Sequence, residues 1–262
     1  MSAPETIQNA AWALSLLAQC TLLILLFSNR NYRLYPYFTA YNLANLVQAA
    51  CVMFSYRVWG HLAMASYEIY WSTQGLVLLA KALALSELSK KFLGYYRGIW
   101  ALAWRFLAAC ALVILTYSIL VANWRWQIAV LVADRGLELA IAGVVVFLFL
   151  FSRYYKVSVS SPDRSLAAGF CLYSCTVVLS NTLIERFLHR YSAWWNIPLL
   201  LLFCVSVLIW IRALRAPVLH TTEQPALVDA ALYWQLSPQI NLRLRGINDQ
   251  LLAIWKPEAP RS

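Results

Sequence analysis

Ionisable side chains inside long apolar stretches are the residues of this sequence whose types and spacing point to chemistry. Asp134, Arg135 and Glu138 stand within one such stretch. On a helix, Asp134 and Glu138 lie one turn apart on a shared face, and Arg135 is three positions from Glu138. The trio carries one negative charge in excess. A proton held by one carboxyl, or a cation from another helix, is therefore expected to complete it.

Two cations from other apolar stretches, Lys81 and Arg105, are expected at a compatible depth, although both side chains are long enough to extend to lipid headgroups instead. A charge near the centre of a bilayer costs at least about 2.5–3.5 kcal/mol, so such groups need partners. Further polar residues lie at nearby depths, namely Asn45, Gln48, Gln74, Glu68 and Glu185. These residues predict a polar cavity open toward the outside, with Glu68 and Glu185 at its mouth. The alternative is a network that only fixes helix packing.

The residues that other membrane chemistries require are missing from the sequence. The last apolar stretch has no lysine for a retinal Schiff base, and His61, His189 and His220 all fall in loops or in the tail, where they cannot ligate haem across a membrane. Cys171 and Cys175 stand one helical turn apart without a histidine beside them, so we interpret them as small buried apolar residues. We expect no cofactor, no metal and no enzymatic activity.

The elements that position these groups follow from composition. Of 262 residues, 62% are hydrophobic and 12% are charged, and the mean hydropathy is +0.62. Soluble domains have about 25% charged residues, so the sequence predicts an all-α integral membrane bundle. The net charge of +10 is expected to flank the spans rather than to bind nucleic acid. Seven stretches are long enough to cross a bilayer, at about 7–27, 37–54, 64–85, 99–121, 127–151, 166–188 and 194–211.

The distribution of Lys and Arg near the ends of the seven predicted spans indicates their orientation, because cytoplasmic loops carry an excess of these residues. Ten of these basic residues lie on the same side of the predicted membrane as the C-terminus, and four lie on the side of the N-terminus. We therefore expect the N-terminus outside and the C-terminus in the cytoplasm. The ten are Arg30, Arg33, Lys90, Lys91, Arg97, Arg153, Lys156, Arg164, Arg212 and Arg215; the four are Arg57, Arg125, Arg186 and Arg190.

A change of composition after Arg215 divides the chain into a transmembrane domain, 1–215, and a polar cytoplasmic tail, 216–262. Ser237 and Pro238 are typical of a helix start, and apolar residues then recur at helical spacing to about residue 256. The apolar positions are Ile240, Leu244, Ile247, Leu251 and Trp255. The tail thus predicts an amphipathic helix, 238–256, that lies on the inner leaflet, packs beneath the bundle or contacts a membrane or cytoplasmic protein partner.

Several aromatic segments carry a resemblance to known proteins. They are Tyr35-Pro36-Tyr37-Phe38 with Tyr41, Tyr67-Glu68-Ile69-Tyr70-Trp71, Glu87, and Tyr95-Tyr96-Arg97-Gly98. Over most of residues 7–215 the chain resembles uncharacterised small seven-span inner-membrane proteins of bacteria. It is more distantly similar to the seven-helix sensor modules fused to bacterial histidine kinases, but no kinase sequence follows residue 215. The resemblance implies a multi-pass protein of the bacterial inner membrane and no particular activity.

Three functions are compatible with these features. The first is a receptor-like or accessory protein whose outward-facing polar cavity binds a small molecule or a lipid headgroup. The second is a small transporter that uses Asp134, Arg135 and Glu138 for proton or ion coupling. The third is a structural membrane subunit. Access to the polar interior from both sides, from the outside alone, or from neither side would distinguish them.

Overall fold

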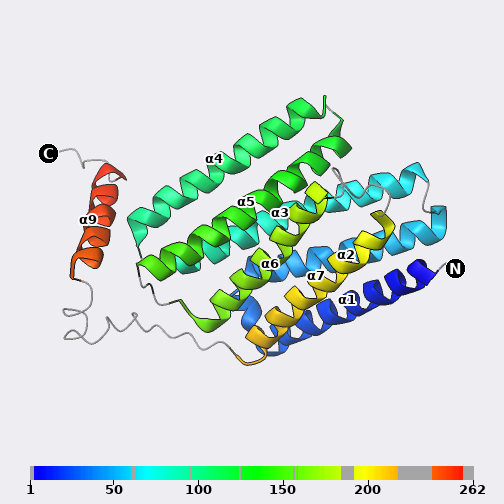
Figure 1. The fold of residues 1–262 in the computed structure, drawn as a ribbon, viewed down its shortest axis with the longest axis horizontal. Helices are drawn as coiled ribbons and strands as arrows, with labels where there is room; N and C mark the ends of the chain where they lie inside the picture. Colours follow the sequence, from blue (N-terminus) through cyan, green and yellow to red (C-terminus); the bar gives the residue numbers. More distant parts are fainter. Residues whose placement is uncertain are drawn as a thin grey trace.

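The computed structural model is an all-α bundle (Figure 1). It describes residues 3–60, 63–94, 96–123, 125–155, 157, 159–183, 192–217 and 238–255. Eight α-helices and one short 3₁₀ helix lie in these segments. They are α1 (Ala3–Ser28), η1 (Asn31–Arg33), α2 (Pro36–Trp59), α3 (Met64–Leu93), α4 (Arg97–Val121), α5 (Trp126–Tyr154), α6 (Ser161–Leu183), α7 (Ser192–Leu214) and α9 (Pro238–Trp255).

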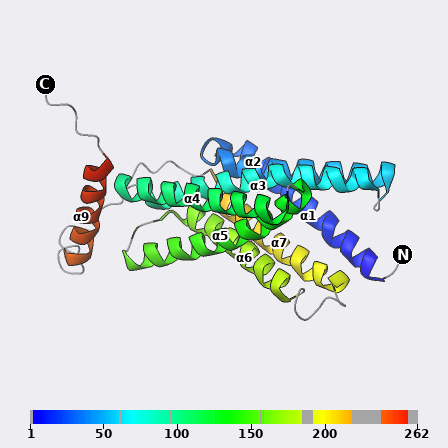
Figure 2. The ribbon, with the colours of Figure 1, turned by 90° about the horizontal axis from the view of Figure 1, so that it is seen from above.

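Helices α1 to α7 run roughly along the long axis of the bundle in Figure 1, and Figure 2 shows α1, α6 and α7 inclined to α2, α3 and α4. α3 has the most neighbours and packs against α2, α4, α5 and α6, while α7 lies between α1 and α6. α4 is an outer helix that packs mainly on α5 and leaves most of its apolar side chains exposed. The polar residues of interest therefore lie on the inner helices, and the most apolar surface faces outward.

Each of the seven predicted apolar ranges overlaps one helix, and some helices are longer than the predicted span. α3 continues to Leu93, beyond residue 85, and α6 begins at Ser161, before residue 166. Both extensions have one cause, because a helix can continue through polar residues on either side of its apolar stretch. Pro162 falls in the first turn of α6, where a missing N–H is tolerated.

Four helices of the described segments are long and apolar enough to cross a membrane. They are Ala10–Ser28 in α1, Gly98–Val121 in α4, Trp126–Tyr154 in α5 and Ile197–Leu214 in α7. The structure therefore has the helical bundle of a membrane protein. α2, α3 and α6 are long but less apolar, because they carry buried polar residues such as Asn42, Lys81 and Ser174.

Side-chain hydrogen bonds hold helices together at one end of the bundle. The amide groups of Asn29 and Asn31 both donate to the carbonyl of Leu214, at 3.1 and 3.2 Å, and so cap the end of α7. At the other side of the same end, α9 lies across the start of α4, where the Gly98 N–H donates to Asn248 Oδ1 at 2.9 Å (Figure 2). The predicted tail helix is thus formed and touches the bundle.

Candidate functional site

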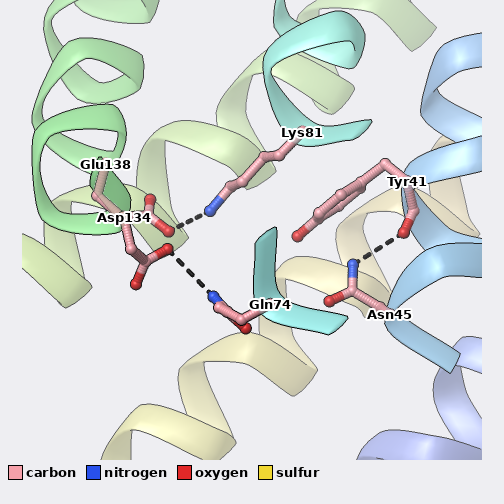
Figure 3. A network of polar contacts seen from close by, with 6 residues as sticks. All are labelled: Tyr41, Asn45, Gln74, Lys81, Asp134 and Glu138. Atoms are coloured by element: carbon pink, nitrogen blue, oxygen red, sulfur yellow. Dashed lines mark hydrogen bonds and ion pairs between the residues drawn. The ribbon is translucent and has the colours of Figure 1, made fainter. Parts of the chain in front are cut away.

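An ion pair between α3 and α5 is the centre of the candidate site (Figure 3). The Lys81 ammonium donates to Oε1 of Glu138, and each side chain is only 5% exposed. Oε2 of Glu138 is also buried and has no hydrogen-bond partner among the described residues. Such an unsatisfied carboxylate oxygen is costly in a low-dielectric interior, so it marks a place where a proton or a cation would be stabilised.

Two tyrosines enclose the Lys81 ammonium from neighbouring helices. The ammonium nitrogen lies 4.6 Å from the ring centroid of Tyr173 on α6, a cation–π contact. Tyr41 of α2 is buried, and its ring points into the space between α2, α3 and α5 (Figure 3). The two rings shield the ion pair from solvent on the side of α2 and α6, which strengthens its electrostatic interactions.

A chain of polar side chains leads away from the ion pair. Asp134, one turn before Glu138 on α5, accepts a hydrogen bond from the Gln74 amide at 3.2 Å. The Gln74 carbonyl oxygen in turn accepts from the Gln48 amide at 2.7 Å. The chain links α5, α3 and α2, and all three of its residues are half-buried. We call Lys81, Glu138, Asp134, Gln74 and Gln48 the central cluster.

The other predicted site residues lie outside the central cluster or contribute to it indirectly. Asn45 donates its amide to the carbonyl of Tyr41 at 3.0 Å, within its own helix. Arg105 has an exposed side chain on α4, so the interhelical cation is Lys81 rather than Arg105. Arg135 on α5 and Glu68 on α3 are also exposed. Glu185 lies outside the described residues.

Sequence reasoning missed the tyrosines of the site. The sequence pattern gives Tyr41 and Tyr173 no role in the predicted polar cavity. A usable signal was present, because Tyr173 stands well inside its apolar stretch, where an interfacial tyrosine would not be expected. A buried tyrosine hydroxyl needs a polar neighbour, which predicts that other polar groups lie close by.

The central cluster holds two carboxylates and one buried ammonium, and the exposed Arg135 supplies a second positive charge beside it. Two carboxylates, Asp134 and Glu138, face one ammonium, Lys81, and neutral amides fill the remaining positions. Arg135, next to Asp134 on α5, has an exposed side chain, and its positive charge also acts on the Asp134 carboxylate. In a low-dielectric interior the unpartnered Oε2 of Glu138 would be stabilised by binding one proton or one monovalent cation. This is the chemistry that the arrangement can perform.

Comparison with known proteins supplies no family for the chain. A scan against protein-family models gives no match, and searches of curated proteins and of solved structures give none either. The functional argument therefore rests on the geometry of the central cluster.

Proposed function

We propose that the chain is a seven-span protein of the bacterial inner membrane, with its N-terminus outside and its C-terminus in the cytoplasm. The four apolar helices support the membrane setting. α2, α3 and α6, of 24, 30 and 23 residues, are each longer than the 30 Å or so of hydrocarbon that a helix must cross. Their polar residues are compatible with a bilayer because they are buried against other helices.

The excess of Lys and Arg in alternate turns supports this orientation. A reporter that is active only in the periplasm tests it. Fused after residue 215 the reporter should be silent, and fused after residue 124 it should be active. The opposite pattern would overturn the orientation while leaving the bundle unaffected.

We further propose that the function of the central cluster is to bind a proton in a small proton-coupled membrane protein. The observation that carries this proposal is the buried Oε2 of Glu138, which has no hydrogen-bond partner among the described residues and lies one helical turn from a second carboxyl, Asp134. The Lys81 side chain and the Tyr173 ring occupy the space around the pair. This close packing favours a proton over the small molecule or lipid headgroup of a receptor.

A measurement of proton uptake tests the proposal. The full-length protein in nanodiscs is titrated in weak buffer with a pH-indicator dye, and the wild type is compared with the double variant Asp134→Asn/Glu138→Gln. We expect the wild type to take up about one proton per chain more than the double variant, because the double variant lacks the carboxyls between which the proton is proposed to bind. The matched control is Asp249→Asn, which removes an exposed carboxylate from α9.

The outcomes separate the three functions. Proton coupling is supported if the wild type takes up about one proton more than the double variant and the Asp249→Asn control does not show the uptake of the double variant. Equal uptake by the wild type and the double variant would overturn proton binding at the central cluster. Binding of a small molecule would then have to be shown for the receptor, and its absence would leave the structural subunit.

A further inference from the structure

An aromatic barrier lies on the cytoplasmic side of the central cluster. Phe38 of α2, Phe170 of α6 and Trp210 of α7 are all buried, with ring centroids 5.9, 5.2 and 5.1 Å apart. Tyr41 joins this packing, with its centroid 5.5 Å from that of Phe170. Because the Tyr41 ring also points toward Lys81 (Figure 3), Tyr41 connects the barrier to the ion pair of the central cluster.

A second group of polar residues lies beyond the barrier. The Tyr35 hydroxyl donates to Asp163 Oδ1 at 2.9 Å, and the Ser160 hydroxyl donates to Oδ2 at 2.5 Å. Burial raises the pKa of the Tyr35 phenol, and the Asp163 carboxylate raises that pKa further, so Tyr35 stays neutral and keeps donating. Both oxygens of Asp163 are therefore engaged as acceptors.

Glu87 of α3 is the other carboxylate, besides Asp163, in this second group of polar residues. Its Oε2 accepts the N–H of Phe38 at 2.9 Å, in the first turn of α2, where the helix dipole favours a negative charge. The charged and titratable groups around Glu87 are Lys91 on its own helix, Tyr35 before α2, and Asp163 on α6. Lys91 itself stacks on the Tyr35 ring, 3.8 Å from the centroid.

A narrow crevice, without room for a water molecule, lies between Glu87 and the rings of Phe38 and Phe170. Its lining consists of Tyr35, Phe38, Ala84, Glu87, Leu88, Leu166 and Phe170. Ala84 and Leu88 follow Lys81 on the same face of α3, at three and seven positions. Glu87 is six residues beyond Lys81, which is about 9 Å along a helix. Along α3, Glu87 and Lys81 are therefore less than two helical turns apart.

We propose that Glu87 is the cytoplasmic proton acceptor for the central cluster, and that Phe38, Phe170 and Trp210 close the path between them. This inference rests on the proposed proton binding at the central cluster. The O–H bond of a protonated carboxyl there breaks, the proton passes over water admitted when the rings separate, and an O–H bond forms on the Glu87 carboxylate. The central cluster returns to its negative charge, and no group is oxidised or reduced.

Proton flux across a membrane tests the barrier and the acceptor together. The full-length protein is reconstituted in liposomes that contain a pH-sensitive dye, and a pH step is applied outside. Phe170→Ala should raise the proton flux at least about tenfold above wild type, because water can then enter the crevice. Phe106→Ala, which truncates an exposed ring on α4, is the matched control and should leave the flux unchanged.

Glu87→Gln in the Phe170→Ala background should return the flux to the wild-type level, because glutamine still accepts the Phe38 N–H but cannot take the proton. If Phe170→Ala does not fold, Phe170→Leu replaces it, with a smaller increase expected. Unchanged flux in a folded Phe170 variant, or an increase that Glu87→Gln does not reduce, would overturn the inference. The proton-uptake titration on the same samples distinguishes this result from a failure of the central cluster to bind a proton at all.

Discussion

Replacing Lys81 with methionine should destabilise the protein more than any other single change at the central cluster. Methionine preserves most of the volume but leaves Glu138, 3% exposed, without its buried cation. Removing one partner of a buried ion pair costs about 3–5 kcal/mol, because the other charge remains uncompensated. Asp134 on the same helix face adds to the repulsion. We therefore expect a loss at the upper end of that range.

The free energy of unfolding can be measured in mixed micelles by circular dichroism as the denaturing detergent is increased. The double variant Lys81→Met/Glu138→Gln should recover most of the loss, because no stranded charge remains at position 138. Lys90→Met, which removes an exposed ammonium of the same helix, should leave the free energy of unfolding nearly unchanged. Lowering the pH should narrow the gap between Lys81→Met and wild type, because the stranded carboxylates then take up protons.

The reasoning would be refuted if the free energy of unfolding of Lys81→Met lay within about 1 kcal/mol of the wild-type value, because an uncompensated buried carboxylate should destabilise the protein by more than that. It would also be refuted if the double variant were no more stable than Lys81→Met. Either result would mean that Glu138 finds another partner or that water reaches it.

Two further predictions concern close helix contacts. Gly169→Ala should cost about 1–3 kcal/mol in thermal unfolding, because the new Cβ would lie 2.2 Å from the indole nitrogen of Trp210, whereas Gly143→Ala, with open space around it, should cost nothing. Equal effects of the two changes would contradict the packing. Gly98→Ala should release α9 from α4, because the Cβ would lie 2.5 Å from the backbone oxygen of Asn248. Hydrogen exchange of residues 238–255 should then become faster, and unchanged exchange would show that α9 is held elsewhere.

The sequence predicts the presence of the helices well, because long apolar stretches in a weakly charged chain have few alternatives. It also predicts that the carboxylates at 134 and 138 need either an interhelical cation or a proton held by one of them. It could not choose between Lys81 and Arg105, because both lie at a similar depth and the choice depends on which face each helix presents. Only the packing of α3 against α5 decides it.

Contacts between distant segments were beyond sequence reasoning. Glu87 stood near the end of a predicted span, and nothing in its own helix indicates that it accepts the N–H of Phe38. The bond from Tyr35 to Asp163 likewise joins residues 128 positions apart. Periodicity shows which face of a helix is polar, but it does not show which other helix that face meets. That Glu87, Tyr35 and Asp163 form one polar group is therefore visible only in the three-dimensional arrangement.

Infrared spectroscopy of the carboxyl groups tests proton binding at the central cluster most directly. The full-length protein in nanodiscs is recorded over a range of pH, and the C=O stretch of protonated carboxylic acids is followed in wild type, Asp134→Asn and Glu138→Gln. Proton binding predicts a band that grows as the pH falls and that is lost or shifted when either carboxyl is replaced. A pH-dependent spectrum that is identical in wild type and both variants would contradict the proposal.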